Sequence, residues 1–98
     1  MAEKFDPKLR LRIALDDLSP EEDPDDFTEL VAAMLEQMPA ESWRSELRAS
    51  IAHQFDLAPN VVRDWASGAT TPTPKFRRVV VKYLRSRAAE LLGGQKGA

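Results

Sequence analysis

Helical periodicity that is interrupted by proline and glycine is the feature that most constrains the fold of this chain. Apolar residues recur every three or four positions from Phe27 to Met38, in register with one face of an α-helix. Pro39 ends this pattern, and another begins behind it. Because prolines and glycines stand at the ends of such patterns, the sequence predicts a series of helices joined by short turns. The predicted helices cover residues 24–38, 42–55, 59–67 and 74–92.

The residues at the helix boundaries support these ranges. Asp23, Ser42 and Thr73 each precede a predicted helix and have side-chain oxygens that can cap its free N–H groups. Gly68 is suited to end the third helix, because glycine adopts the left-handed conformation that is common at helix ends. The apolar side chains that we expect these helices to bury are Phe27, Leu30, Val31, Met34, Leu35, Met38, Trp43, Leu47, Ile51, Phe55, Val62, Trp65, Ala66, Phe76, Val79, Val80, Tyr83, Leu84 and Leu91.

Residues 8–15 alternate apolar and charged side chains, which favours a β-strand. The strand would carry Leu9, Leu11, Ile13 and Leu15 on one side. A helix is the alternative, since Asp6 and Pro7 form a plausible helix start and most residues of the segment are good helix formers. At helical spacing, however, the apolar residues scatter to two sides. The prediction therefore leans to a strand, and since a lone strand needs a partner, we expect it to pair with the same segment of a second chain in a homodimer.

Composition restricts the class of protein. A chain of 98 residues suffices for one domain. It has no cysteine, which rules out disulfides, thiolate zinc ligands and a cysteine nucleophile. With a single His and no glycine-rich phosphate loop, no catalytic constellation can be assembled, so we expect no enzyme, metal or cofactor. No apolar run approaches the ~20 residues that span a bilayer, and no signal peptide is evident, so we expect a cytoplasmic protein that does not bind membranes.

Charge divides the chain into two unlike parts. Residues 1–41 hold four basic against twelve acidic residues, a net charge of −8, whereas residues 42–98 hold ten against four, a net charge of +6. A basic segment favours a polyanion as partner, and the acidic segment favours shielding or docking on another protein. The acidic cluster at residues 23–26 lacks the ligand spacing and central glycine of a calcium loop, so we interpret it as a helix start.

The basic part contains a set of residues in a recognisable register: Ile51, Ala52, Phe55, Leu57, Val62, Trp65, Gly68 and Pro72. Over residues 48–74 the chain resembles the lambda-repressor/Cro-like (XRE-type) helix-turn-helix family. The resemblance implies an all-α fold: a four-helix domain at residues 24–92 with its motif at 48–68. An N-terminal extension at 1–23, which contains the predicted short strand, and a tail at 93–98 complete the chain.

The resemblance also implies a function, namely sequence-specific binding of double-stranded DNA by a small transcriptional regulator. In the family, the start of the second motif helix enters the major groove. This assigns base reading to Asn60, Val61, Arg63 and Asp64. Phosphate contacts are assigned to Arg44, Arg48, Lys75, Arg77 and Arg78. The alternative is a protein-interaction module, antitoxin-like or a regulatory adaptor, whose acidic N-terminal part docks on a partner.

Overall fold

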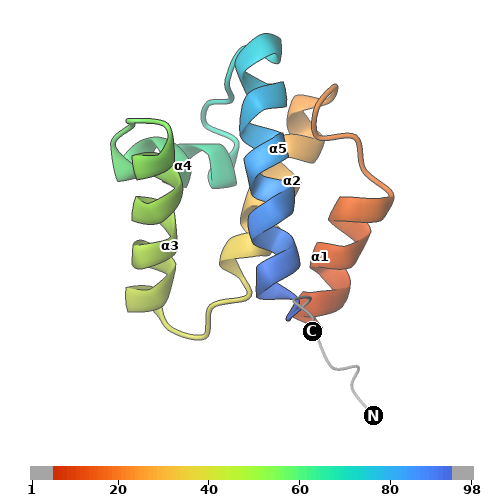
Figure 1. Cartoon of the computed structure of the whole chain (residues 1–98), viewed down its shortest axis with the longest axis vertical. Coiled ribbons are helices and arrows are strands. Elements are labelled where there is room, and N and C mark those ends of the chain that lie inside the picture. Colours follow the sequence, from red (N-terminus) through yellow and green to blue (C-terminus); the bar gives the residue numbers. More distant parts are fainter. Residues whose placement is uncertain (1–5, 94–98) are drawn as a thin grey trace.

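Five α-helices, and no β-strand, make up residues 6–93, the part of the chain that the computed structural model describes (Figure 1). The helices are α1 (Pro7–Asp16), α2 (Pro24–Leu35), α3 (Glu41–Gln54), α4 (Pro59–Ser67) and α5 (Pro74–Leu91). The all-α prediction is confirmed. None of the helices in residues 6–93 is long and apolar enough to cross a membrane.

Most of the predicted helix boundaries are confirmed, because local capping chemistry sets them. The Asp23 carboxylate accepts a hydrogen bond from the backbone N–H of Asp25 at 2.8 Å, and Gly68 ends α4 in the left-handed conformation with φ of 83°. Thr73 caps α5 as predicted. The prediction that Ser42 caps α3 is wrong. This helix begins one residue earlier, after Ala40, and has no side-chain cap.

The predicted strand at residues 8–15 is wrong, because this segment lies within helix α1. The Asp6 carboxylate caps α1 by accepting from the N–H of Lys8 at 3.1 Å. Leu11 and Ala14, three positions apart, are fully buried, whereas Leu9 and Ile13 are 53% and 44% exposed. The expected one-sided ridge is therefore absent, and with it the basis for strand pairing between two chains. The segment is a helix because that conformation buries Leu11 and Ala14 in the core, and this burial outweighs the strand-like alternation of its sequence.

Helix α1 is held to α2 by polar contacts as well as by burial. The Arg10 guanidinium forms ion pairs with Glu29, at 2.5 Å, and with Glu36. The Gln37 side chain, just after α2, donates a hydrogen bond to the carbonyl oxygen of Pro7 at 2.7 Å. Leu11 and Ala14 belong to the same buried cluster as the residues of the other four helices. Residues that the sequence assigned to an N-terminal extension are thus part of the core.

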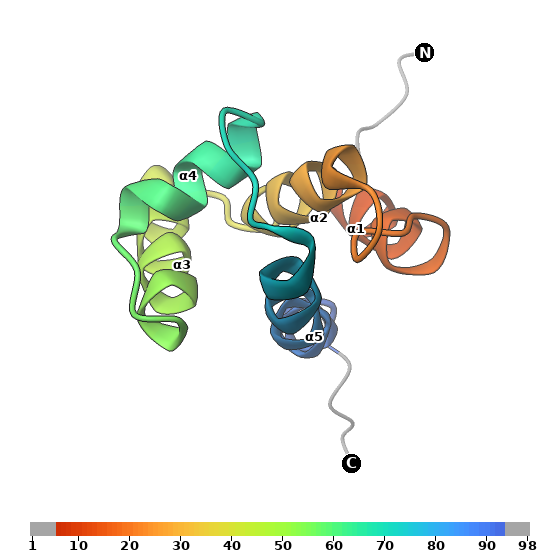
Figure 2. The ribbon, with the colours of Figure 1, turned by 90° about the horizontal axis from the view of Figure 1, so that it is seen from above.

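Helix α2 forms the centre of the core (Figure 2). It contacts all four of the other helices, which places the fully buried Phe27, Leu30, Val31 and Met34 in the middle of the domain. The Phe27 ring packs edge-to-face on Trp65 of α4, with ring centroids 5.3 Å apart. The orientation of α4 is therefore fixed by the helix that the other four surround.

Two residues that we expected in the core lie on the surface instead. Trp43, in the first turn of α3, is 55% exposed, and Val79 on α5 is 54% exposed. Helix α5 buries Val80, Val81 and Leu84, so that Val79 is turned outward. Both predictions are wrong because helical spacing gives the direction of a side chain but not whether a neighbouring helix covers it there.

Candidate nucleic-acid interface

Helices α3 and α4 are joined by a short turn, and α4 crosses the end of α3 (Figure 1). The turn is closed by a hydrogen bond from the N–H of Leu57 to the carbonyl oxygen of Ala52 at 2.8 Å. Asp56 adopts a positive φ of 58°, a conformation that Asp tolerates better than most residues. Ala52 is fully buried. A small side chain at this point allows the two helices to cross closely.

Two buried side chains set the rotation of α4 about its own axis. Val62 is fully buried and Trp65 is 3% exposed. Trp65 packs on Phe76 of α5 as well as on Phe27, with ring centroids 6.4 Å apart for the pair with Phe76. Because this side of α4 is fixed in the core, the opposite side faces solvent.

The predicted base-reading residues divide into two groups. Asn60 and Arg63, three positions apart, are both exposed and lie on the outer side of α4. Val61 is half-buried against the core, and Asp64 is half-buried. The Asp64 carbonyl oxygen accepts from the Ser67 hydroxyl at 3.1 Å and from the N–H of Ala69 at 3.0 Å, in the turn that ends α4. The outer surface of α4 therefore presents an amide and a guanidinium.

Two of the predicted phosphate contacts, Arg44 and Arg48, converge on one carboxylate. Glu41 Oε2 lies 2.5 Å from Arg48 Nη2, and Glu41 Oε1 lies 3.8 Å from Arg44 Nη1. The hydrogen bond from Arg48, together with the charge of that guanidinium, holds the pKa of Glu41 below its ordinary value. Glu41 is not among the residues predicted from the sequence to lie at the site. Its spacing of three and seven positions from these arginines along one helix is the signal that could have revealed it.

The predicted phosphate contacts on α5 lie in different surroundings. Lys75 is exposed and has no ion pair with any residue in 6–93. Arg78 is exposed and lies 3.5 Å from the Glu22 carboxylate. Both side chains can reach an anion in solvent, although Arg78 must first leave Glu22.

Arg77 is an exception, because it is only 5% exposed. Its guanidinium donates to the carbonyl oxygens of Pro72 at 3.0 Å, Glu21 at 3.3 Å and Glu22 at 3.4 Å. These bonds attach the segment between α1 and α2 to the start of α5. The prediction that Arg77 contacts phosphate does not fit this position, since the side chain is nearly buried and each of its three nitrogen atoms donates to a carbonyl oxygen of the protein.

A neighbouring arginine strengthens the same attachment. Arg85 donates to both carboxylate oxygens of Glu21, at 2.9 and 3.1 Å, and to the carbonyl oxygen of Leu15 at 2.9 Å. The hydrogen bonds from Arg85 lower the pKa of Glu21. The acidic segment between α1 and α2 therefore neutralises part of the basic flank of α5.

Comparisons with known proteins give no match: no model of a protein family, no curated protein and no solved structure is similar to this chain. Within residues 6–93 no three His, Asp or Glu side chains are grouped so that they could hold a metal ion.

Proposed function

We propose that the protein binds double-stranded DNA sequence-specifically, as a small transcriptional regulator with a lambda-repressor-like helix-turn-helix domain. The observation that carries this proposal is the orientation of α4. Burial of Val62 and Trp65 turns Asn60 and Arg63 outward, and α3 crosses behind them. A short helix supported in this way fits the major groove of B-DNA, which is wide enough to admit one α-helix.

The exposed side chains of α4 suit base recognition. The Asn60 amide both donates and accepts, which matches the N6 and N7 edge of adenine. Arg63 can donate two hydrogen bonds to guanine or one to a phosphate. Val61 and Asp64 are half-buried and therefore have smaller roles: the Val61 methyl groups contact a thymine methyl, and the Asp64 carboxylate accepts from cytosine.

The phosphate contacts follow from the exposed positive charges. Lys75 is available in the free protein, whereas Arg44, Arg48 and Arg78 exchange a carboxylate for a phosphate when DNA binds. Such an exchange costs little for Arg78, whose ion pair lies at the surface, and more for Arg48, whose side chain is only 16% exposed. Together these contacts attract the protein to DNA of any sequence, and the attraction weakens as the salt concentration rises.

Selection of bound duplexes from a random library tests this proposal. The affinity of the selected sequence and of an unrelated duplex is then measured over a range of salt concentrations. We expect an enriched motif, and an affinity for both duplexes that falls linearly with salt on logarithmic axes. Recovery of random sequences, with no salt dependence, would contradict DNA binding.

One observation favours a second candidate function, a protein-interaction module. Four of the five predicted phosphate contacts are engaged by carboxylates or carbonyl oxygens of the same chain, so the free basic charge is small. The salt titration separates the two functions, because a protein partner held mainly by apolar contacts binds with little dependence on salt.

A further inference from the structure

A hollow of about 430 Å³ lies between α3 and α5. Met38, Leu47 and Leu91 give it an apolar wall, and Trp43 and Glu46 of α3 also line it. Its volume lies within the range of about 300–1,000 Å³ that is usual for small-molecule sites, which are mostly apolar and have a few polar groups that orient the ligand. Because helix α4 contributes no residue to the hollow, the proposed function does not account for it.

The residues that α3 contributes to the hollow lie on one side of the helix. They are Trp43, Glu46, Leu47 and Ser50. Counted from the first, the others lie three, four and seven positions along the chain, which is the spacing of neighbours on one helix face. Leu47 is buried, whereas Trp43 is 55% exposed and Glu46 is exposed. An incoming molecule therefore meets a buried apolar surface beside an indole ring and a carboxylate that are open to solvent.

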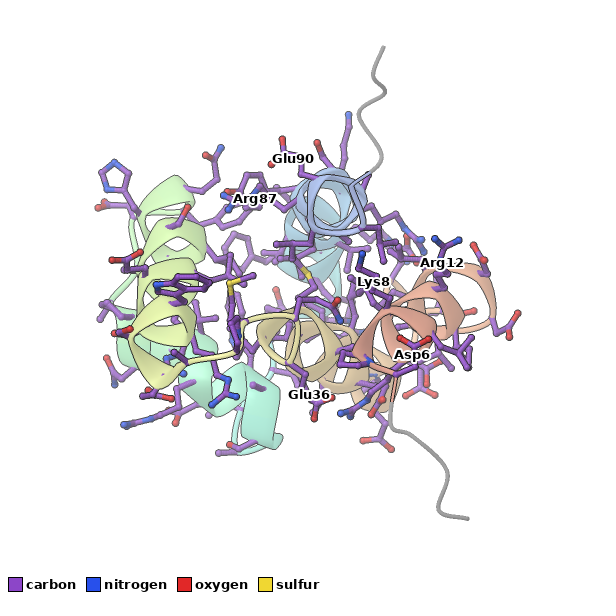
Figure 3. The ribbon with its side chains drawn as sticks, turned by 90° about the horizontal axis from the view of Figure 1, so that it is seen from below. Asp6, Lys8, Arg12, Glu36, Arg87 and Glu90 are labelled. Atoms are coloured by element: carbon purple, nitrogen blue, oxygen red, sulfur yellow. The ribbon has the colours of Figure 1, made fainter. Side chains whose placement is uncertain are left out.

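The basic side chain that lines the hollow, Arg87, already has partners in the same chain. Figure 3 shows Arg87 reaching from α5 toward α3. Its Nη1 donates to the hydroxyl groups of Ser50 and Tyr83, each at 2.9 Å, and its Nε lies 3.3 Å from the Glu90 carboxylate. An anionic ligand would have to compete with Glu90 for this guanidinium. Arg87 therefore does not favour an anion in the hollow.

Glu46 provides the uncompensated charge of the hollow, since it forms no ion pair with any residue in 6–93. The carboxylates of Glu46 and Glu90 together outnumber the guanidinium of Arg87, so the charge around the hollow is negative. Charge complementarity therefore favours a cation. The exposed indole of Trp43 favours the same ligand, because the face of a tryptophan ring attracts a cation within about 6 Å of its centroid.

We propose that the hollow binds a small organic cation with an apolar body, such as an alkylammonium compound. The ammonium group lies against the Trp43 indole and close to the Glu46 carboxylate, which are near enough on α3 to contact one group. The apolar body packs on Met38, Leu47 and Leu91. This inference goes beyond the proposed function and does not depend on DNA binding.

Titration with hexyltrimethylammonium, followed by backbone amide chemical shifts without DNA, tests the site. Hexanol and hexanoate are the matched neutral and anionic probes. We expect hexyltrimethylammonium to bind with a Kd of about 1–10 mM, as is usual for a ligand of this size, and to shift the amides of α3 and α5 that surround the hollow. Hexanol should bind more weakly, and hexanoate most weakly. One further methylene in the alkyl chain should strengthen binding by up to about fourfold.

Three variants assign the contributions of charge and ring. Glu46→Gln should weaken binding of the cation about fivefold, the effect of one charge at about 4 Å in water, and should leave binding of hexanol unchanged. Trp43→Leu keeps an apolar side chain but removes the ring, so it should weaken binding of the cation about two- to fivefold. The matched control Asp16→Asn removes an exposed carboxylate from α1 and should leave every affinity unchanged.

Shift changes confined to residues outside the hollow overturn the inference, and so does hexanoate binding as strongly as the cation. A Glu46→Gln or Trp43→Leu variant with wild-type affinity for the cation also overturns it, as does an Asp16→Asn variant that loses as much affinity as Glu46→Gln. A capped tripeptide with one lysine between two leucines distinguishes a free cation from a basic segment of a protein. Tighter binding of this peptide than of hexyltrimethylammonium overturns the assignment to a small molecule.

Discussion

Replacing Arg77 by Met separates a structural arginine from one that contacts DNA. The Arg77 guanidinium is nearly buried and donates to three carbonyl oxygens, at 3.0, 3.3 and 3.4 Å. A hydrogen bond from a charged group contributes about 1.5–3 kcal/mol, and only the shortest of these three lies within the usual N···O range of about 2.7–3.2 Å. Methionine keeps the apolar part of the side chain. We therefore expect Arg77→Met to lower the free energy of unfolding by about 2–4 kcal/mol.

Urea unfolding followed by circular dichroism measures this loss. For a domain of this size, a loss of about 2 kcal/mol lowers Tm by roughly 8 °C or more. Arg78→Met is the matched control, because Arg78 is the next residue, is exposed and forms only a surface ion pair with Glu22. The free energy of unfolding of the Arg78→Met variant should therefore differ from that of wild type by less than about 1 kcal/mol. In DNA binding by the folded variants, Arg78→Met should lower the salt slope by about 1 and Arg77→Met should not. An Arg77→Met variant with wild-type stability and a reduced slope would refute the reasoning.

Three further predictions concern the interface and the ion pairs. Asn60→Ala should cost about 1–3 kcal/mol on the selected site and little on random DNA, and equal losses on both would exclude base reading. Glu41→Gln should raise affinity for every duplex, because Arg44 and Arg48 no longer have a competing carboxylate. Glu46→Gln is the control and should leave affinity unchanged, because Glu46 forms no ion pair within residues 6–93. Equal effects of the two variants in a filter-binding titration would contradict this role of Glu41. The Arg10 side chain lowers the pKa of Glu29 below its ordinary 4.5, so the stability from this pair is complete above that pH and is lost as pH falls through the lower folded-state pKa. Glu29→Gln should flatten the acid side of the stability profile, and an unchanged profile would assign acid unfolding to other groups.

Much of the fold follows from local signals in the sequence. Asp23, Thr73 and Gly68 mark helix ends through chemistry that operates within a few residues, and the periodicity of α2 and α4 predicts their buried sides. The outward positions of Asn60 and Arg63 follow from the same periodicity, once Val62 and Trp65 are taken as buried.

The remaining features depend on contacts between distant segments. Residues 8–15 satisfy both a strand and a helix pattern, and only the packing of Leu11 within the core chooses the helix. In the sequence, Arg77 cannot be distinguished from the other basic residues of its helix. Its structural role depends on the carbonyl oxygens of residues 21 and 22, which only the folded chain brings to it. Trp43 is 55% exposed at the edge of the open space between α3 and α5, and no pattern within α3 encodes that space.

Backbone amide chemical shifts recorded during titration with the selected duplex test the central claim most directly. The account predicts that the largest changes occur at Asn60 and Arg63 on the outer side of α4, with smaller ones near Arg48 and Lys75. Helix α1 should be unaffected. Changes confined to α1 or to the hollow around Trp43, with α4 unchanged at saturating DNA, would contradict the assignment of α4 as the DNA-reading helix.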